Sequence, residues 1–369
     1  MRKVGIVGGG QLGRMLIQAG IDFDLQMKVL DRSADSPCAG IAHRFQVGSP
    51  QKAEDIERFA EDIDLLTIEL EEVSVEGLRR AAEKGIEVAP SAEVVELIQD
   101  KGKQRSWYAA RGFPSPRFQL WQPGEAIQLE FPLIQKAFRG GYDGRGVQKV
   151  SAPSQLWQVP SLLEELVPIA QEVSVIVARS RSGEVRAFPP VEAVFHPIAH
   201  LVEYLRIPAS LPEAALQEAQ TIASEIAEAL EVVGLLAVEF FYTEQGKWLV
   251  NESAPRPHNT GHITTRACWT SQFEQHWRAL LGLPLGETRL HTYGALVNIL
   301  GHAEGAGTYH LIGVKEVLRL PGVSLHLYGK KHSTPFRKLG HVLILAPSPR
   351  ELLSIVETVR SALRVELAS

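Results

Sequence analysis

The chain has 369 residues, 45% of them hydrophobic, and a formal net charge of −5 at pH 7, so we expect a globular protein of two or three domains. The negative charge argues against a nucleic-acid-binding surface, and no apolar run approaches the roughly 20 residues of a membrane span. Two distant cysteines, Cys38 and Cys268, and an N-terminus without a signal pattern indicate structural thiols in a cytoplasmic protein.

The first predicted element is a short buried strand at residues 4–7, followed by Gly8-x-Gly10-x-x-Gly13 and a helix. A glycine turn between a strand and a helix start favours anion binding, because free N–H groups and the helix dipole both point at the turn. A second apolar strand ends at Asp31, near the position where a dehydrogenase binds ribose. The motif therefore predicts phosphate binding, without deciding between a dinucleotide and another phosphate.

The rest of the chain divides by its periodicity. Residues 1 to about 95 alternate strands with helices, which is typical of a parallel sheet. A helix then stops at Gly112, and antiparallel strands follow from about residue 130. The pattern next predicts a long amphipathic helix over 212–233, a hairpin of strands 235–242 and 247–253, and a small strand-and-turn region at 294–345 closed by a helix.

A second glycine-rich stretch, "IQKAFRGGYDGRGVQKV", carries the strongest local signal. Lys136 ends a strand, and four glycines follow it: Gly140, Gly141, Gly144 and Gly146. Such a loop can fold closely over phosphates, with Lys136 supplying a cation. Tyr142, Asp143 and Arg145 lie between the glycines, which favours a functional loop over a flexible hairpin tip. Lys103, on the preceding helix, is either a second phosphate lysine or a solvated helix residue.

The following strands offer carboxylates for a nucleotide and a metal. Glu172 could accept from ribose hydroxyls, and the extended backbone at 165–167 could bind adenine; each glutamate alone could also be a solvated charge. Glu239 interrupts an otherwise apolar strand, and Glu252 ends the partner strand of the hairpin. Two carboxylates brought together in this way suit Mg²⁺, the alternative being a hydrogen-bonded Glu239 and an ordinary ion pair at Glu252.

Two polar runs complete the pattern. The first, "APRPHNTGH", is predicted to be a rigid site loop and contains Arg256, His258, Asn259 and His262. Zinc binding by its two histidines is weakly supported, since no third ligand has suitable spacing. The second, "HLYGKKHSTPFRKLGH", is either a solvated basic loop or a clamp on an anionic substrate, and it contains Lys330, Lys331, Arg337 and Lys338.

Taken in order, these motifs resemble the ATP-grasp superfamily and, within it, the 5-(carboxyamino)imidazole ribonucleotide synthase family. The resemblance rests on "GGGQLGRM", "TIELEEV", "KAFRGGYDGRG", "LEELVPIAQEVSVIVARS", "AVEFF", "VNESAPRPHNTGH", "ALVNILG" and "HLYGKKHSTPFRKLGH". It implies an ATP-grasp fold of the α/β and α+β classes in three parts. These are a Rossmann-like parallel α/β domain at 1–100, a small mobile B domain at 101–178, and a mixed C-terminal domain at 179–369.

The resemblance also implies the reaction. ATP and bicarbonate would form carboxyphosphate, and 5-aminoimidazole ribonucleotide would be carboxylated on its exocyclic amine, giving ADP and phosphate in purine biosynthesis. ATP and Mg²⁺ are the implied cofactors, and a homodimer is the implied assembly. In this family the first glycine loop faces the ribonucleotide, so the dehydrogenase interpretation becomes a false positive.

Site roles follow from the same resemblance. The implied ATP-binding residues are Lys103, Lys136, Gly141, Gly144, Gly146, Glu164, Glu165, Leu166, Val167 and Glu172, and the implied magnesium ligands are Glu239 and Glu252. The ribonucleotide would contact Gln11, Leu12, Glu71, Lys330, Arg337 and Lys338. The groups implied around the imidazole and carboxyphosphate are Tyr142, Asp143, Arg145, Arg256, His258 and Asn259, with Asp143 or His258 handling the amine proton.

One position departs from the family pattern, which has a glycine where this chain has Phe336, so the phosphate clamp loses a freely rotating residue. The nearest rival is another ATP-grasp ligase, such as a formate-dependent glycinamide ribonucleotide transformylase. "GGYDGRG" together with "PRPHN" argues against that ligase. A non-catalytic nucleotide-binding regulator is a rival of another class, which retention of the lysines and the metal glutamates argues against.

Overall fold

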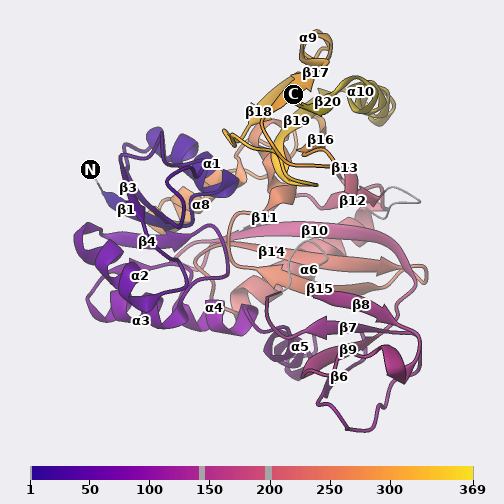
Figure 1. The fold of residues 1–369 in the computed structure, drawn as a ribbon. Helices are drawn as coiled ribbons and strands as arrows, with labels where there is room; N and C mark the ends of the chain where they lie inside the picture. The colour runs from indigo at the N-terminus through magenta and orange to yellow at the C-terminus, as the bar shows by residue number, and fades with distance from the viewer. Residues whose placement is uncertain (1, 141–145, 196–201, 369) are drawn as a thin grey trace.

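The N-terminal part of the chain is a parallel sheet between helices. A computed structural model describes residues 2–140, 146–195 and 202–368 (Figure 1). The five strands lie in the order β3-β2-β1-β4-β5, and all of their pairings are parallel. The strands are β1 (Lys3–Val7), β2 (Gln26–Asp31), β3 (Arg44–Val47), β4 (Leu65–Ile68) and β5 (Glu87–Val88), and the helices are α1 (Gln11–Ile21), α2 (Ala53–Phe59), α3 (Val75–Glu83) and α4 (Ala92–Ile98). The predicted parallel sheet is confirmed, and β3 is an additional, partly exposed edge strand that lacks a buried apolar run.

A second, smaller sheet follows α5 (Lys101–Ala110), the helix that was predicted to stop at Gly112. Its strands are antiparallel, in the order β6-β9-β7-β8. They are β6 (Phe118–Trp121), β7 (Leu133–Ala137), β8 (Val147–Val150) and β9 (Ser161–Glu165). Figure 1 shows this sheet at the lower edge of the molecule, beside α5.

The largest sheet runs in the order β15-β14-β10-β12-β13-β16-β19-β18, with β11 paired to β10. Its strands are β10 (Ile169–Arg179), β11 (Val185–Ala187), β12 (Val191–Phe195), β13 (Val202–Ile207), β14 (Gly234–Thr243), β15 (Trp248–Ala254), β16 (Tyr293–Leu300), β18 (Val323–Leu327) and β19 (Lys338–Ala346). The predicted hairpin is β14–β15, and the predicted long helix is α6 (Glu213–Ala229).

Alternation along β10 explains how this sheet is covered on both faces. Val175 and Val177 belong to the cluster packed under α6, whereas Ile176 belongs to a cluster that includes Trp277 of α8 (Gln272–Leu281). The Trp277 indole donates to the Leu16 carbonyl of α1 at 2.8 Å. This contact joins the N-terminal sheet to the large sheet, so residues from both parts can line one site.

The chain ends in a small region at the top of Figure 1. There the closing helix α10 (Pro349–Ala362) packs on β16 and β19. The last described strand, β20 (Arg364–Leu367), which the sequence did not suggest, pairs with β17 (Tyr309–Ile312). The remaining elements are α9 (Val314–Val317), α7 (Thr264–Ala267) and the short 3-10 helices at Ala60–Asp62, Pro153–Gln155 and Asn259–Ile263.

The domain division at residues 100 and 178 stays a prediction. The four-stranded sheet ends with β9 at Glu165, and β10 already belongs to the large sheet. Within the described ranges, each helix is too short or too polar to cross a bilayer.

Candidate active site

The predicted metal pair lies across the β14–β15 hairpin. Glu239 and Glu252 are direct partners in the register, next to an irregularity between Glu239 and Phe240. Removal from water and the nearby Glu252 carboxylate raise the pKa of Glu239 to about 8. Two facing carboxylates without a cation between them repel each other, so this hairpin is built to receive positive charge.

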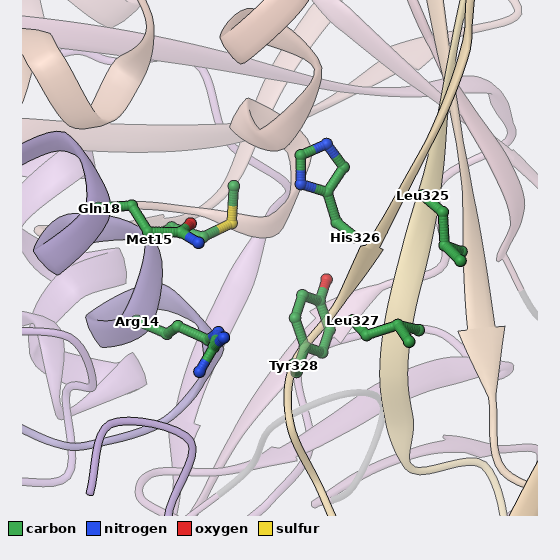
Figure 2. Close-up of a pocket in the computed structure, with 7 residues that line it drawn as sticks. All are labelled: Arg14, Met15, Gln18, Leu325, His326, Leu327 and Tyr328. Atoms are coloured by element: carbon green, nitrogen blue, oxygen red, sulfur yellow. The ribbon is translucent and has the colours of Figure 1, made fainter. Parts of the chain in front are cut away.

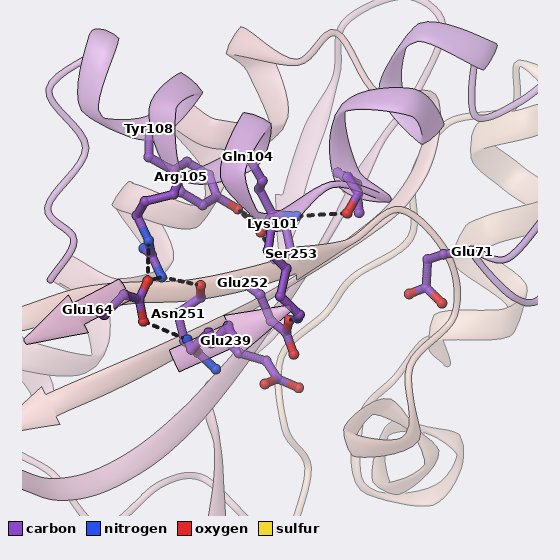
Figure 3. A network of polar contacts seen from close by, with 12 residues as sticks. Glu71, Lys101, Gln104, Arg105, Tyr108, Glu164, Glu239, Asn251, Glu252 and Ser253 are labelled. Carbon is purple, nitrogen blue, oxygen red and sulfur yellow. Dashed lines mark hydrogen bonds and ion pairs between the residues drawn. The ribbon is translucent and has the colours of Figure 1, made fainter. Parts of the chain in front are cut away.

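Cations approach the pair from α5 and β7. The Lys101 ammonium forms an ion pair with Glu252, and Lys136 donates to the Asn251 side chain at 2.9 Å. Burial alone would raise the pKa of Glu252, but the neighbouring Lys101 and Lys136 hold it below its ordinary range. Figure 3 shows Lys101 close to Asn251 and Glu252 of β15.

A buried ion network lies behind this pair. Glu164 on β9 binds Lys136 at 2.7 Å and Arg105 at 2.6 Å. Arg105 also donates to the backbone carbonyls of Val250 and Asn251. The Arg105 and Glu164 side chains are each only 2% exposed. The network therefore fixes the small sheet and α5 against β15 at the place where the carboxylate pair sits.

Helical spacing brings these groups together from α5. Lys101, Gln104, Arg105 and Tyr108 recur at intervals of three or four residues and face the hairpin. The Tyr108 hydroxyl lies 2.6 Å from the Ser253 hydroxyl, and Gln104 accepts from the Ser253 backbone N–H at 2.9 Å. The resulting cleft is lined by Lys101, Gln104, Arg105, Lys136, Leu162, Asn251 and Glu252.

Lys103, the phosphate lysine suggested by the sequence, is not part of this cleft. Its side chain is 52% exposed and its ammonium lies 3.1 Å from Glu96. Lys103 is two residues from Lys101 and two from Arg105, and two residues of a helix turn a side chain by about 200°, so Lys103 points away from the face that carries Lys101 and Arg105. The structure thus corrects the sequence by placing Lys101 and Arg105 beside the carboxylates.

The residues suggested for the nucleotide base and ribose lie on β9, β10 and their connection. Glu165 binds Arg117 at 2.7 Å, and Leu166 is 40% exposed beside Val167. Glu172 lies on β10 beside β14, and burial raises the pKa of its carboxyl. The side chain of Glu164 is committed to the buried network, which leaves only its backbone for a ligand.

The second glycine loop is described only at its stem. Gly141, Tyr142, Asp143, Gly144 and Arg145 lie outside the described residues. The loop's stem is described: the Ala137 N–H donates to the Gly146 carbonyl at 2.9 Å. The stem therefore starts directly after Lys136, at the edge of the cleft.

The first glycine loop has its N–H groups bound by the chain itself. Glu69 accepts from Gly10 at 2.8 Å and from Gly13 at 2.9 Å, and Asp31 accepts from Gly9 at 2.7 Å. These two carboxylates occupy the donors that a dinucleotide phosphate would need. Glu69, which the sequence did not single out, is therefore a structural anchor of the loop, and the dehydrogenase interpretation loses its binding site.

The "APRPHNTGH" run links the two halves of the site. Arg256 forms an ion pair with Glu71 at 2.6 Å, and His258 lies 3.3 Å from Glu239. Burial, followed by the positive charge of Arg256, keeps the pKa of His258 well below its ordinary value, so this imidazole is neutral at pH 7. The buried side-chain oxygen of Asn259 has no hydrogen-bond partner among the described residues.

His262, from the same run, lies in the core rather than beside the carboxylates. Its ring stacks on His341 with 4.8 Å between the ring centres. No group of three or more His, Cys, Asp or Glu side chains within the described ranges gathers in a way that could hold a metal. A metal at Glu239 and Glu252 would thus need further oxygen ligands from elsewhere.

The basic C-terminal run meets the first glycine loop. The Lys330 ammonium contacts Gln11 at 3.2 Å and the Lys338 carbonyl at 2.6 Å. Arg337 donates to the His332 carbonyl at 2.9 Å, and Lys331 pairs with Asp35. Of the two adjacent lysines, Lys330 contacts Gln11 of the loop, whereas Lys331 pairs with Asp35.

Two further residues that the sequence singled out, Leu12 and Phe336, lie at this end of the site. Leu12 is buried in the core, so only its backbone can face a ligand at the tip of the loop. Phe336 has a φ of 58° and is 53% exposed. It thus holds the left-handed backbone conformation in which glycine is favoured.

A separate cavity lies between α1 and β18 (Figure 2). Tyr328 lines it, with its hydroxyl 2.7 Å from His341 and its ring centre 5.5 Å from the Lys330 ammonium. The cavity therefore adjoins the basic run rather than the carboxylate pair. Its lining residues are Arg14, Met15, Gln18, Leu325, His326, Leu327 and Tyr328.

The paired sheets, the carboxylate pair and the converging cations define a member of the ATP-grasp class. The family model described as an ATP-grasp domain matches residues 107–273. Models described as a ribonucleotide synthetase preATP-grasp domain and a phosphoribosylaminoimidazole carboxylase C-terminal domain match residues 1–99 and 294–354.

Individual relatives identify the family within the ATP-grasp class. The crystal structure of N5-carboxyaminoimidazole ribonucleotide synthetase from Thermotoga maritima is 36% identical, with a TM-score of 0.91 and full coverage of both chains. The Aspergillus clavatus N5-carboxyaminoimidazole synthase, in complex with ADP and 5-aminoimidazole ribonucleotide, is 29% identical, with a TM-score of 0.87 and 98% coverage of both chains. A chloroplastic phosphoribosylaminoimidazole carboxylase of Vigna aconitifolia is 36% identical over 94% of this chain, which spans 64% of the plant protein. The chain belongs to the N5-carboxyaminoimidazole ribonucleotide synthase family, as the sequence motifs predicted.

Proposed function

We propose that this protein carboxylates 5-aminoimidazole ribonucleotide to N5-carboxyaminoimidazole ribonucleotide, using ATP and bicarbonate, in de novo purine biosynthesis. The observation that carries the proposal is the convergence of Lys101, Arg105 and Lys136 on the hairpin that bears Glu239 and Glu252. A phosphoryl group in transfer needs such converging positive charge. The same site continues through Arg256 to the ribonucleotide side at Glu71.

Mg²⁺ is the metal that fits this donor set. It prefers oxygen ligands and is commonly held by one or two carboxylates together with substrate phosphates, and Glu239 and Glu252 are two facing carboxylates. Glu239 and Glu252 would hold the ion. When bound, it would neutralise the charge that develops on the transferred phosphoryl group.

The nucleotide would be held by residues on both sides of the cleft. Lys101 and Lys136, which line the cleft, would face its phosphates, in place of the Lys103 suggested by the sequence. Glu172 would accept from the ribose hydroxyls, and the backbone at 164–167 would bind adenine. Gly141, Gly144 and Gly146 of the glycine loop would cover the phosphates through their N–H groups.

The chemistry then takes two balanced steps. A bicarbonate oxygen attacks the γ-phosphorus of ATP, and ADP leaves to give carboxyphosphate. The amine nitrogen attacks the carbonyl carbon, phosphate leaves, and the amine proton passes to Asp143 or to the neutral His258. Residues that close over this anhydride would exclude water, which would otherwise hydrolyse it; they are Tyr142, Asp143, Arg145, Arg256 and Asn259.

The ribonucleotide would lie between the first glycine loop and the basic run. Glu71 and the Gln11–Leu12 tip of that loop would face the imidazole and ribose. The ribonucleotide's own phosphate would be bound by Lys330, Arg337 and Lys338, where arginine can bind it in a bidentate manner. A homodimer and a cytoplasmic location belong to the same proposal, and light scattering and cell fractionation test them.

ADP release in the presence of ATP, Mg²⁺ and bicarbonate tests the function. We expect strong stimulation by 5-aminoimidazole ribonucleotide and loss of release in Glu252→Ala. Release that does not depend on the ribonucleotide would indicate another acceptor, such as that of glycinamide ribonucleotide transformylase. No release at all would favour a non-catalytic regulator. Within this assay, Lys136→Met should lower kcat/KM for ATP at least about a hundredfold, and Lys103→Met by less than about threefold.

A further inference from the structure

Lys101 occupies an unusual position, because its ammonium pairs with a residue that would bind a metal. It is the first residue of α5, its side chain is only 17% exposed, and its partner is the Glu252 carboxylate. A cation of the chain thus already neutralises one of the two facing carboxylates, so any metal must compete with this cation for Glu252.

The backbone of Lys101 is tied to the glycine loop. Its N–H donates to the Phe138 carbonyl at 2.8 Å, just beyond the end of β7. The neighbouring Gly102 packs so closely against the Phe138 ring that a Cβ there would lie 2.7 Å from it, and Asp100 lies 3.5 Å from the Arg139 side chain. The start of α5 is therefore held in place independently of the Lys101 side chain, and the ammonium can change partner without moving the helix.

The other cations near Glu239 and Glu252 already have partners, which explains why the Lys101 ammonium pairs with Glu252. Lys136 is already bound by Glu164 and Asn251, and Arg105 by Glu164 and two backbone carbonyls. His258 lies 3.3 Å from Glu239 and not at Glu252. Among the described residues, the Lys101 ammonium is thus the lysine or arginine group that forms an ion pair with Glu252.

We propose that Lys101 is a positioning residue that occupies the place of the metal at Glu252 until nucleotide enters, so that the metal binds together with the nucleotide rather than before it. The inference rests on the function proposed above. In the nucleotide-free enzyme, the ammonium lowers metal affinity by neutralising Glu252. Nucleotide phosphates would bring both additional metal ligands and a new partner for the ammonium.

Mn²⁺ binding, followed by the electron paramagnetic resonance of free Mn²⁺, tests this inference without measuring activity. In the absence of nucleotide, Lys101→Met should bind Mn²⁺ about five- to tenfold more tightly than the unaltered enzyme, the range expected on removing one partly buried competing charge. Lys101→Arg, which keeps the charge, and Lys103→Met, which removes an exposed charge from the same helix, should stay within about twofold. Lys101→Gln provides a polar substitute if Lys101→Met does not fold.

Glu252→Gln separates the two proposals. With ADP present, this variant should lose Mn²⁺ binding; unchanged binding would refute the metal site and with it the mechanism proposed above. If Glu252→Gln loses the metal but Lys101→Met and Lys101→Gln bind Mn²⁺ as the unaltered enzyme does, the metal site stands and the role of Lys101 is refuted. A gain in affinity shared by Lys103→Met would likewise refute it, since any loss of positive charge would then suffice.

Discussion

Replacing Glu164 with glutamine removes the negative charge from the buried ion network behind the active site. The side chains of Glu164 and Arg105 are each 2% exposed, and Lys136 also binds this carboxylate. In Glu164→Gln an amide would face two buried cations, leaving them without a counter-charge. Breaking a buried pair in this way typically costs 3–5 kcal/mol, so we expect the free energy of unfolding to fall by about 3 kcal/mol.

Glu165→Gln is the matched control. This variant replaces the neighbouring glutamate in the same way, but the Arg117 side chain that pairs with Glu165 is 76% exposed. Exposed ion pairs contribute only about 0–1 kcal/mol to the free energy of unfolding. Urea unfolding followed by circular dichroism measures both variants, and the melting temperature of Glu164→Gln should fall by about 5 °C or more. Equal stability of the two variants would refute the reasoning, because burial would then make no difference to the pair.

The same network predicts a pH effect of definite sign. Burial alone would raise the pKa of Glu164, but the charges of Lys136 and Arg105 hold it below its usual range. The folded state therefore binds the proton less tightly than the unfolded state, so this carboxylate stabilises the fold above the unfolded pKa and less so as the pH falls through the folded pKa. Glu164→Gln should accordingly show a weaker loss of stability in acid than the unaltered protein.

Three further substitutions test the glycine loop and the basic run. Burial raises the pKa of Glu69 from 4.5 to about 6, so between these two pH values the folded state binds more protons than the unfolded state. The free energy of unfolding should therefore fall by about 2 kcal/mol as the pH rises through this range. Glu69→Gln should lack this pH dependence when unfolding is followed in urea. Gly13→Ala would place a Cβ 2.9 Å from the Gly8 carbonyl oxygen and should destabilise the protein by about 1–3 kcal/mol in the same assay. Phe336→Gly, which relieves a left-handed φ of 58°, should raise the melting temperature and stabilise the fold by about 0.5–1 kcal/mol; a lower melting temperature would mean that the ring contributes more than the backbone loses.

Local pattern was sufficient to predict that Glu239 and Glu252 lie together on one hairpin. Glu239 breaks an apolar strand, and the short turn after that strand brings it alongside the strand that bears Glu252. The irregularity between Glu239 and Phe240, which places Glu252 directly opposite Glu239, does not follow from counting along the sequence. The same reasoning identified α6 from its helical periodicity. Both predictions needed only interactions between neighbours in the chain.

The choice among the α5 residues needed the tertiary structure. The sequence analysis selected Lys103, but the face that meets β15 carries Lys101 and Arg105. Arg105 is charged and yet fully buried, which the sequence conceals because its partner Glu164 lies 59 residues away. The pairing of Glu69 with the first glycine loop is of the same kind, with partners 56 and 59 residues apart. Contacts this distant are set by the fold rather than by local pattern.

The "APRPHNTGH" run connects the carboxylate pair, where phosphoryl transfer would occur, with Glu71 on the acceptor side of the site. Its two charged contacts point to opposite sides: Arg256 binds Glu71 of the N-terminal part, and His258, two residues later, meets Glu239 of the metal pair. The prolines around them restrict the backbone, so the distance between these contacts is nearly fixed. A group transferred from the phosphoryl side to an acceptor beside Glu71 would therefore need to cross only the span of this loop. This short span suits an unstable intermediate, because carboxyphosphate would meet the amine before it could meet bulk water.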